Sequence, residues 1–175
     1  MMGQGPPHIQ GQGRHSARGR TNGDERQGEG MGDQDHDVGT TSWEDETGLV
    51  TLPGGARVRG RRLGDPASPA DFALVLGKGA PPAWPCRRVR WPDFGVPADR
   101  GDALDALGEA HRRALAGERV EVACRGGVGR TGTALAALAV LDGLHPGQAV
   151  AWVRGHYHRR AVETPWQRRW LHNLR

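Results

Sequence analysis

The stretch of this chain that most constrains its fold is a short apolar strand followed at once by a glycine-rich loop and a helix. Val120 and Val122 alternate with polar neighbours, as residues of a strand do, and three glycines follow between residues 126 and 129. The alanine- and leucine-rich segment 134–144 predicts a helix that is apolar almost all round and therefore buried. This order of elements places Cys124 at the end of a strand, facing the N-terminus of a helix.

The loop after Cys124 has the composition of an anion-binding site. Glycine lets the backbone turn its N–H groups inward, and the helix that follows adds the positive end of its dipole. Arg130 contributes a planar set of donors from the same loop. A thiol in such a field loses its proton more readily than a free thiol, so we expect Cys124 to be a thiolate nucleophile.

Two other kinds of site have a similar glycine pattern. Residues 127–132 fit the dinucleotide fingerprint G-x-G-x-x-G, but residues 150–154 lack the acidic residue that the fingerprint needs about 20 positions later. An NTPase phosphate loop needs Gly-Lys followed by Ser or Thr, and no such sequence follows these glycines. A lone cysteine can also be an inert buried thiol; the nearby Arg130 and Thr131 argue against that alternative.

Cys124, five further residues, Arg130 and Thr131 form a family signature, and the chain resembles the cysteine-dependent protein-tyrosine and dual-specificity phosphatases. Residues 91–97, Trp-Pro-Asp-Phe-Gly-Val-Pro, resemble the mobile general-acid loop of that family, and residues 162–167, Val-Glu-Thr-Pro-Trp-Gln, resemble its glutamine segment. The order of these segments differs from that of the low-molecular-weight phosphatases, in which the acid follows the nucleophile. The resemblance covers roughly residue 43 to the C-terminus, with one departure: Ala123 stands where the family usually has His.

The resemblance implies hydrolysis of a phosphate monoester in two steps. Cys124 would attack phosphorus and form a cysteinyl phosphate, while Arg130 and the loop amides hold the phosphate oxygens. Asp93 would protonate the leaving oxygen and later take a proton from water, Gln167 would orient that water, and Thr131 would donate to the sulfur. The implied phosphate-binding residues are Arg125, Gly126, Gly127, Val128, Gly129 and Arg130.

Other interpretations of these residues stay open at this point. Asp93 fits an Asx turn, and Gln167 fits a capping box with Thr164 as N-cap and Pro165 as the first helical residue. A module that binds phosphate without catalysis is one alternative function, which Ala123 keeps open, and cysteine sulfurtransfer is another. Phosphoinositide or small-metabolite phosphates are alternative substrates, because no counterpart of the loop that deepens the pocket of the tyrosine-specific branch is evident.

The other cysteine, Cys86, lies just before the strand-like segment 87–91. In the lipid and dual-specificity phosphatases that the domain resembles, a cysteine in a similar place can form a reversible disulfide with the nucleophile. The resemblance therefore implies Cys86 as a redox partner of Cys124, with a plain turn as the alternative. Two cysteines in a chain without the apolar core of a signal peptide predict a reducing, cytoplasmic location.

Composition divides the chain at residue 46. Residues 1–46 have almost no apolar side chains to offset the entropy of ordering, so we expect a disordered tail, with the phosphatase domain at 47–175. The tail holds four Arg against nine Asp and Glu, and the remainder holds 20 Lys and Arg against 11 Asp and Glu. A basic domain attracts a phosphorylated protein or another phosphate monoester. No helix-turn-helix, zinc or RNA-platform motif accompanies the charge, so nucleic acid is not predicted as a partner.

The remaining pattern predicts an α/β domain with a central mixed sheet flanked by helices, like that of the protein-tyrosine phosphatases. The eight histidines show no paired metal spacing, so no metal and no cofactor is predicted. No run of residues reaches the length of a membrane span, and the oligomeric state is left open. Further strands are expected at 49–52, 57–63, 72–76 and 87–91, and further helices at 100–116, at 146–152 and from 165 onward.

Overall fold

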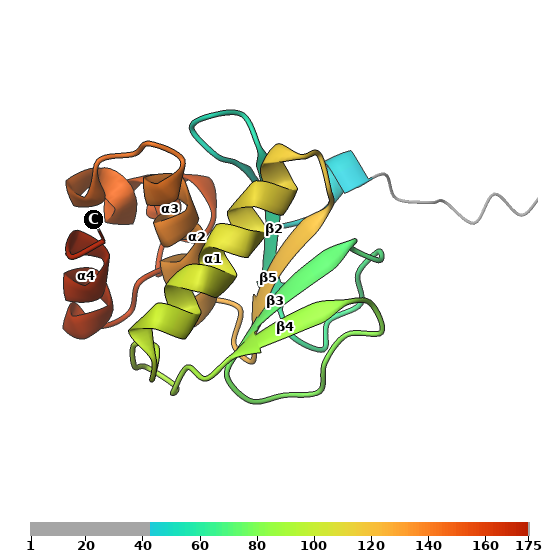
Figure 1. The fold of residues 1–175 in the computed structure, drawn as a ribbon, viewed down its shortest axis with the longest axis horizontal. Helices are drawn as coiled ribbons and strands as arrows, with labels where there is room; N and C mark the ends of the chain where they lie inside the picture. The colour runs from blue at the N-terminus through green and yellow to red at the C-terminus, as the bar shows by residue number, and fades with distance from the viewer. Residues whose placement is uncertain (1–42, 175) are drawn as a thin grey trace, which may run out of the picture. The chain divides into compact units, whose positions relative to one another are not determined.

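The computed structural model describes residues 43–174, which form a five-stranded sheet with the strand order β1-β2-β5-β3-β4 (Figure 1). β1 runs antiparallel to β2, and all other neighbours are parallel, so the predicted mixed sheet is confirmed. β5 is the central strand and carries the predicted nucleophile at its C-terminal end. The strands are β1 Leu49–Thr51, β2 Arg57–Arg62, β3 Phe72–Leu76, β4 Cys86–Val89 and β5 Val120–Cys124.

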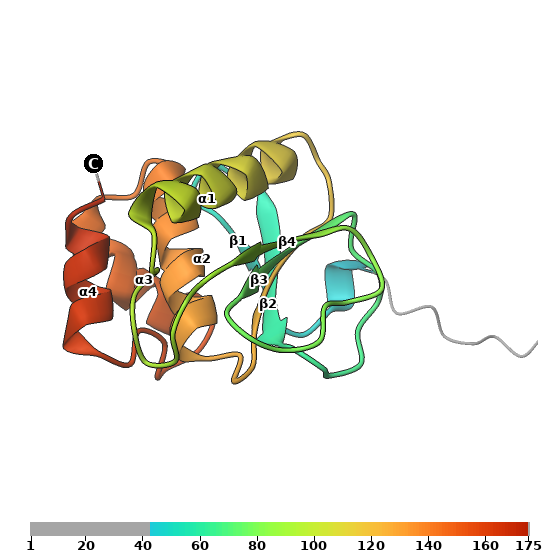
Figure 2. The same cartoon turned by 60° about the horizontal axis from the view of Figure 1, so that its bottom comes forward.

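The α-helices gather on one side of this sheet, as the two views in Figures 1 and 2 show. Alternate residues of β5, among them Val120 and Val122, share a single apolar core with the inner faces of the helices. The helix that follows β5 is the most deeply buried of them, as its composition predicts. The helices are α1 Arg100–Leu115, α2 Gly129–Leu141, α3 Ala149–His156 and α4 Pro165–His172, with short 3-10 helices η1 Trp43–Asp45 and η2 Pro146–Gln148.

Several element boundaries differ from those expected from the sequence. α2 begins at Gly129 and not at residue 134, so the glycines and threonines that read as loop form its buried first turns. Packing outweighs helix propensity here, because a Cβ on Gly132 would lie 2.5 Å from the Cβ of Ala161. β4 ends at Val89, two residues before Trp91, and the helix expected from residue 146 starts as η2 and continues as α3.

The opposite side of the sheet is held together by charge. The carboxylate of Glu121, on β5, accepts hydrogen bonds from Arg59 and Arg61 of β2, and both Glu121 and Arg59 are fully buried. Arg59 also pairs with Glu46 at 2.9 Å and lies over the ring of Trp43, 4.2 Å from its centroid. Residues 43–46, which fall within the predicted tail, therefore pack on the sheet, and residues 1–42 of that tail lie outside the described part of the chain.

A search of residues 43–174 for a membrane-spanning element finds no helix of sufficient length and hydropathy.

Candidate active site

Cys124 ends β5 with its side chain buried, and only 1% of the residue is exposed. The backbone N–H of Gly127 donates to the sulfur at 3.2 Å, and the backbone N–H of Leu63 donates to the Cys124 carbonyl at 2.8 Å. The sulfur therefore faces the inside of the glycine-rich loop.

The loop itself has a shape that only glycine permits at one point. Gly127 has φ +67°, and a Cβ there would lie 2.7 Å from the backbone nitrogen of Arg62. The hydroxyl of Tyr157, which follows α3, donates to the Gly127 carbonyl. Burial raises the pKa of Tyr157, and negative charge at Cys124 raises it further, so the hydroxyl remains a donor at neutral pH.

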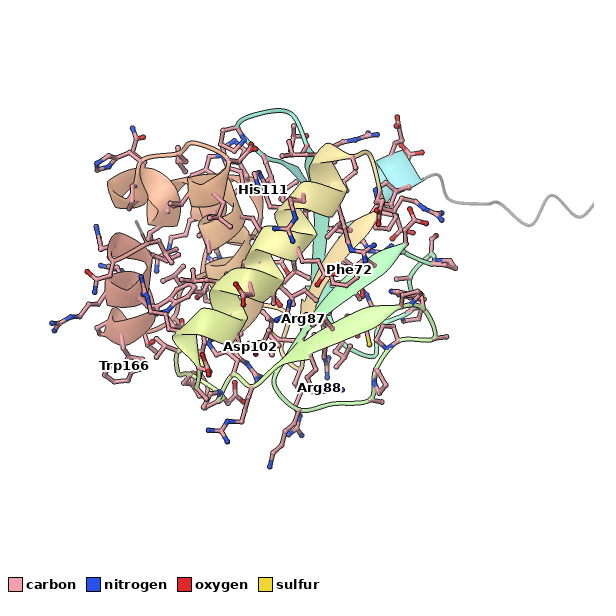
Figure 3. All side chains as sticks on the ribbon, viewed as in Figure 1. Phe72, Arg87, Arg88, Asp102, His111 and Trp166 are labelled. Atoms are coloured by element: carbon pink, nitrogen blue, oxygen red, sulfur yellow. The ribbon has the colours of Figure 1, made fainter. Side chains whose placement is uncertain are left out.

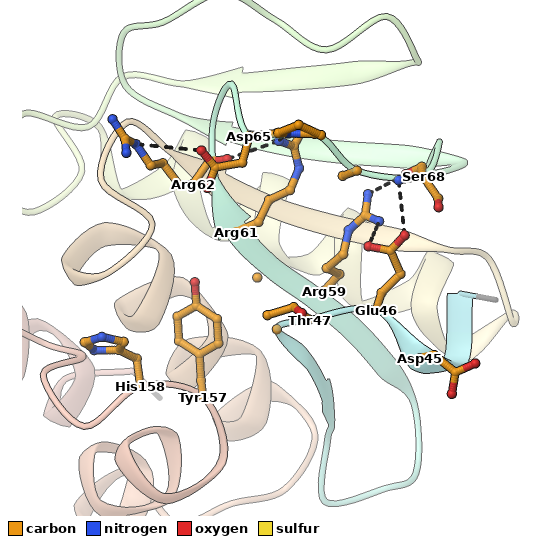
Figure 4. A pocket seen from close by; sticks show the side chains of 14 residues that line it. Asp45, Glu46, Thr47, Arg59, Arg61, Arg62, Asp65, Ser68, Tyr157 and His158 are labelled. Atoms are coloured by element: carbon orange, nitrogen blue, oxygen red, sulfur yellow. Dashed lines mark hydrogen bonds and ion pairs between the residues drawn. The ribbon is translucent and has the colours of Figure 1, made fainter. Parts of the chain in front are cut away.

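Tyr157 also lines a hollow of about 740 Å³ behind the loop, drawn in Figure 4. Glu46, Arg59 and His158 contribute to the same hollow. Tyr157 thus lies between this hollow and the Gly127 carbonyl of the glycine-rich loop.

Arg130 lies in the first turn of α2 and is 5% exposed. Its Nη1 donates to the carbonyls of Leu76, at 3.4 Å, and Trp91, at 3.2 Å. Its Nη2 pairs with Oδ1 of Asp93 at 2.9 Å. A single guanidinium therefore joins the end of β3, the start of the predicted acid loop and the predicted acid itself.

The predicted acid loop, residues 91–97, folds back over a buried tryptophan. Trp91 packs edge-on against Trp170, with ring centroids 5.3 Å apart, and its Nε1 donates to the Gly95 carbonyl at 2.9 Å. Phe94 adopts the left-handed conformation, at φ +55°. Asp93, whose side chain is 62% exposed, is left at the open side of the loop with its carboxylate on Arg130.

Gln167 is fully buried, and both ends of its amide have hydrogen-bond partners. Its Oε1 accepts from the backbone N–H groups of Glu163, at 2.8 Å, and Thr164, at 3.3 Å, which confirms the predicted capping box of α4. Its Nε2 donates to the Gly95 carbonyl at 3.2 Å. Trp166 adds a bond from Nε1 to the Phe94 carbonyl at 2.7 Å. The start of α4 therefore holds the acid loop, a function for Gln167 that the sequence did not suggest.

Comparison with known proteins gives matches of family and of fold. Residues 84–161 match the family described as protein-tyrosine phosphatase. The structure of Tk-PTP in the active form is 28% identical over 60% of this chain and 78% of its own, with a TM-score of 0.54. A kinase associated phosphatase with serine in place of its catalytic-site cysteine is 20% identical over 61% of this chain and 68% of its own, with a TM-score of 0.54, and supports the fold alone.

These matches support a relationship to the protein-tyrosine phosphatases through residues 84–161. The sheet and helices of the chain form the α/β fold of those phosphatases.

Thr131 and Ala123 depart from what the family resemblance implies. The Thr131 hydroxyl is buried and has no hydrogen-bond partner within residues 43–174, so the predicted bond to sulfur is not formed in this conformation. Ala123 is fully buried on the sheet side that carries Glu121, and it supplies no hydrogen bond where the family usually has His.

Glu163 was missed by sequence reasoning. Its carboxylate lies over the N-terminus of α2, where a Cβ added to Gly129 would be 1.9 Å from Oε2. It lines a hollow of about 340 Å³ together with Cys124, Asp93 and Arg130. Glu163 directly precedes Thr164, the N-cap of α4. This position was the signal that the sequence offered for Glu163.

The predicted redox pairing of Cys86 with Cys124 is not supported by the geometry. Cys86 pairs with Ala73 on one side of β3, and Cys124 pairs with Leu76 on the other side. Strand spacing and rise place their Cα atoms roughly 14 Å apart, whereas a disulfide needs about 4.4–6.8 Å. Cys86 is also exposed at the edge of the sheet, so the prediction failed because sequence proximity to the acid loop does not give strand order.

Within residues 43–174, no group of three or more His, Cys, Asp or Glu side chains is arranged to hold a metal ion.

Proposed function

We propose that this protein hydrolyses phosphate monoesters through a cysteinyl-phosphate intermediate, as a protein-tyrosine or dual-specificity phosphatase. The observation that carries the proposal is the ion pair between Arg130 and Asp93, at 2.9 Å. Arg130 comes from the loop that surrounds the Cys124 sulfur, so this pair brings the candidate acid to the same hollow as the candidate nucleophile. Nucleophile, oxyanion donors and acid are the minimum set for such a reaction.

In the first step, the Cys124 thiolate attacks phosphorus in line with the leaving oxygen. The S–P bond forms as the P–O bond breaks, and the loop amides with Arg130 Nη2 hold the equatorial oxygens. Nη1 keeps its bonds to Leu76 and Trp91, so the guanidinium stays oriented while Nη2 exchanges Asp93 for phosphate. Asp93, released from the ion pair, takes up a proton from solvent and gives that proton to the leaving oxygen.

In the second step, water attacks phosphorus, Asp93 takes its proton and the sulfur leaves. The Thr131 hydroxyl is the proposed donor to the departing sulfur. Gln167 remains the proposed residue that orients the water, but its Nε2 must first leave the Gly95 carbonyl. Its two roles, holding the loop and orienting water, therefore alternate within one catalytic cycle.

The test is turnover of a generic aryl phosphate with a metal chelator present. Wild-type protein should hydrolyse the ester, and Asp93→Ala should lose about 10²–10⁴-fold with leaving groups of high pKa but little with those that depart unprotonated. Equal losses of rate for both kinds of ester would indicate that Asp93 forms a turn and does not act as the general acid. Binding of phosphate without any turnover by wild-type protein would instead support the non-catalytic phosphate-binding module.

Substrate choice among phosphorylated proteins, phosphoinositides and small metabolites is tested by comparing rates across those classes.

We also propose a cytoplasmic location, because both cysteines within the described residues are free thiols.

A further inference from the structure

Beside the proposed phosphate site lies a second, larger hollow of about 1040 Å³. The two hollows share the lining residues Asp93, Arg125 and Arg130, so the second one adjoins the proposed phosphate site. Trp91 and Pro92 line it from the acid loop. Its volume is at the upper end of that of drug-sized ligand sites, about 300–1,000 Å³, and exceeds what a single phosphate fills.

Four basic side chains line this second hollow and are exposed to solvent: Lys78, Arg88, Arg90 and Arg125. We refer to them as the basic rim. None of them forms an ion pair with a carboxylate anywhere in residues 43–174, whereas the two carboxylates of the hollow are already paired. Asp93 pairs with Arg130, and Asp102 pairs with Arg87 at 2.8 Å. The hollow therefore has a surplus of positive charge with no internal partner.

The Arg88 side chain is held in place by hydrogen bonds to the backbone of the turn that carries Lys78. Arg87 faces α1 and Asp102, and Arg88 emerges from β4 on the other side, as Figure 3 shows. Arg88 donates to the carbonyls of Gly77 and Gly79, at 2.9 Å for the latter, and so fixes the turn that carries Lys78. Arg88, fixed in this way, presents its charge without the full entropic cost of ordering a long side chain.

The other side of the phosphate site has the opposite sign. Glu163 lies over the N-terminus of α2, in the small hollow that also contains Cys124. A substrate with a second negative group would be repelled on the Glu163 side and attracted on the basic-rim side. The two sides together therefore favour one orientation of an acidic substrate.

We propose that the basic rim is a substrate subsite that binds acidic side chains flanking the phosphorylated residue of a peptide. The inference rests on the proposed phosphatase function of the adjoining site. Arginine presents donors in a plane that matches a carboxylate, and a hollow of about 1040 Å³ has room for more than one additional phosphate.

The experiment compares two phosphotyrosine peptides of equal length, one flanked by Asp and Glu and the other by Asn and Gln. Two or three exposed ion pairs of ordinary strength should raise kcat/KM for the acidic peptide roughly tenfold at low salt. In the double variant Lys78→Gln/Arg90→Gln, the ratio between the two peptides should fall at least about threefold. Arg88 is left unchanged because it holds the turn.

Arg112→Gln is the matched control, because Arg112 is an exposed arginine ten residues beyond Asp102 on α1, about 15 Å further along the helix. Arg112→Gln should leave the ratio of kcat/KM between the acidic and neutral peptides as it is in the wild type. At 1 M salt, where the Debye length is about 3 Å, the preference should largely disappear.

A parallel binding measurement with Cys124→Ser and fluorescent versions of both peptides separates this proposal from the catalytic one. If the acidic peptide binds more tightly but wild-type protein turns over neither peptide, the result would contradict the proposed phosphatase function and support the subsite. Equal affinities and equal rates for the two peptides would overturn the subsite, as would a preference unaffected by the double variant. A preference found for small bisphosphates but not for the peptides would overturn the peptide as occupant.

Discussion

The nucleophile loop and the acid loop meet at Arg130, but they are held by different means. The nucleophile loop joins the central strand β5 to the buried helix α2, and main-chain packing fixes it at Gly127 and Gly132. The acid loop is held by side chains that donate to its carbonyl groups, from Trp91, Trp166 and Gln167. The first arrangement suits a rigid anion site, and the second suits a loop that opens and closes, because single hydrogen bonds are individually weak.

The largest effect should come from the nucleophile loop. In Cys124→Ser, turnover should fall to background because the thiolate is gone, while phosphate binding persists through the loop amides and Arg130. Steady-state rates and calorimetric titration with inorganic phosphate measure the two properties separately. Cys86→Ser, which alters the cysteine at the sheet edge, should retain wild-type rates; full activity in Cys124→Ser would remove the nucleophile assignment.

Arg130→Lys should have the next largest effect because Arg130 belongs to both loops. Lysine cannot donate to phosphate, Leu76 and Trp91 at once, so kcat/KM should fall by about 10²–10³-fold and phosphate affinity should also fall. Crystal structures or loop-proton NMR shifts would reveal a displaced Trp91. A lysine variant with wild-type kcat/KM would show that the two loops do not depend on this guanidinium.

Gln167→Leu should damage the acid loop while sparing the nucleophile loop. The bond to Gly95 and half of the capping box are lost, so we expect roughly tenfold slower turnover of esters with poor leaving groups and a stability loss of about 1–2 kcal/mol. Phosphate affinity of the Cys124→Ser background should change little. Gln148→Leu, at an exposed position in η2, controls for the loss of an amide. A large loss of phosphate affinity would contradict the separation between the loops.

Trp166→Phe should have the smallest effect. The ring is retained and only the N–H bond to the Phe94 carbonyl is lost, at a site that is 57% exposed. We expect about a two- to threefold loss for esters with poor leaving groups, near the lower limit for one hydrogen bond. If the loss exceeded that of Gln167→Leu, the tryptophan and not the glutamine would be the main support of the loop.

Much of the arrangement could be predicted because it follows from local rules. The strand end at Cys124, the capping box at Thr164 and Gln167, and the all-apolar helix α2 each depend on residues a few positions apart. The second bond of Gln167 to Gly95 and the position of Glu163 depend on how α4 packs on distant segments, which no local pattern encodes. The separation of Cys86 from Cys124 depends on strand order for the same reason.

The alternation Val-Glu-Val in β5 shows where a local rule misleads. A half-exposed strand would place Glu121 in water, yet Glu121 is buried because Arg59 and Arg61 neutralise it from the neighbouring strand. Charged residues at alternate positions of β2 would likewise fit a strand with one side in water. When β2 and β5 pair, their charged residues neutralise one another and form a buried ionic layer.

That ionic layer also determines where the protein can be shortened. Glu46 supplies Arg59 with its second carboxylate, and Trp43 covers the same guanidinium. Removal of one partner from a buried ion pair typically costs about 3–5 kcal/mol, a large share of the stability of an ordinary domain. A cut before Trp43 keeps every neighbour of the central strand that lies within residues 43–174, whereas a cut after Glu46 removes a partner of Arg59, which pairs with Glu121 on the strand that ends in Cys124.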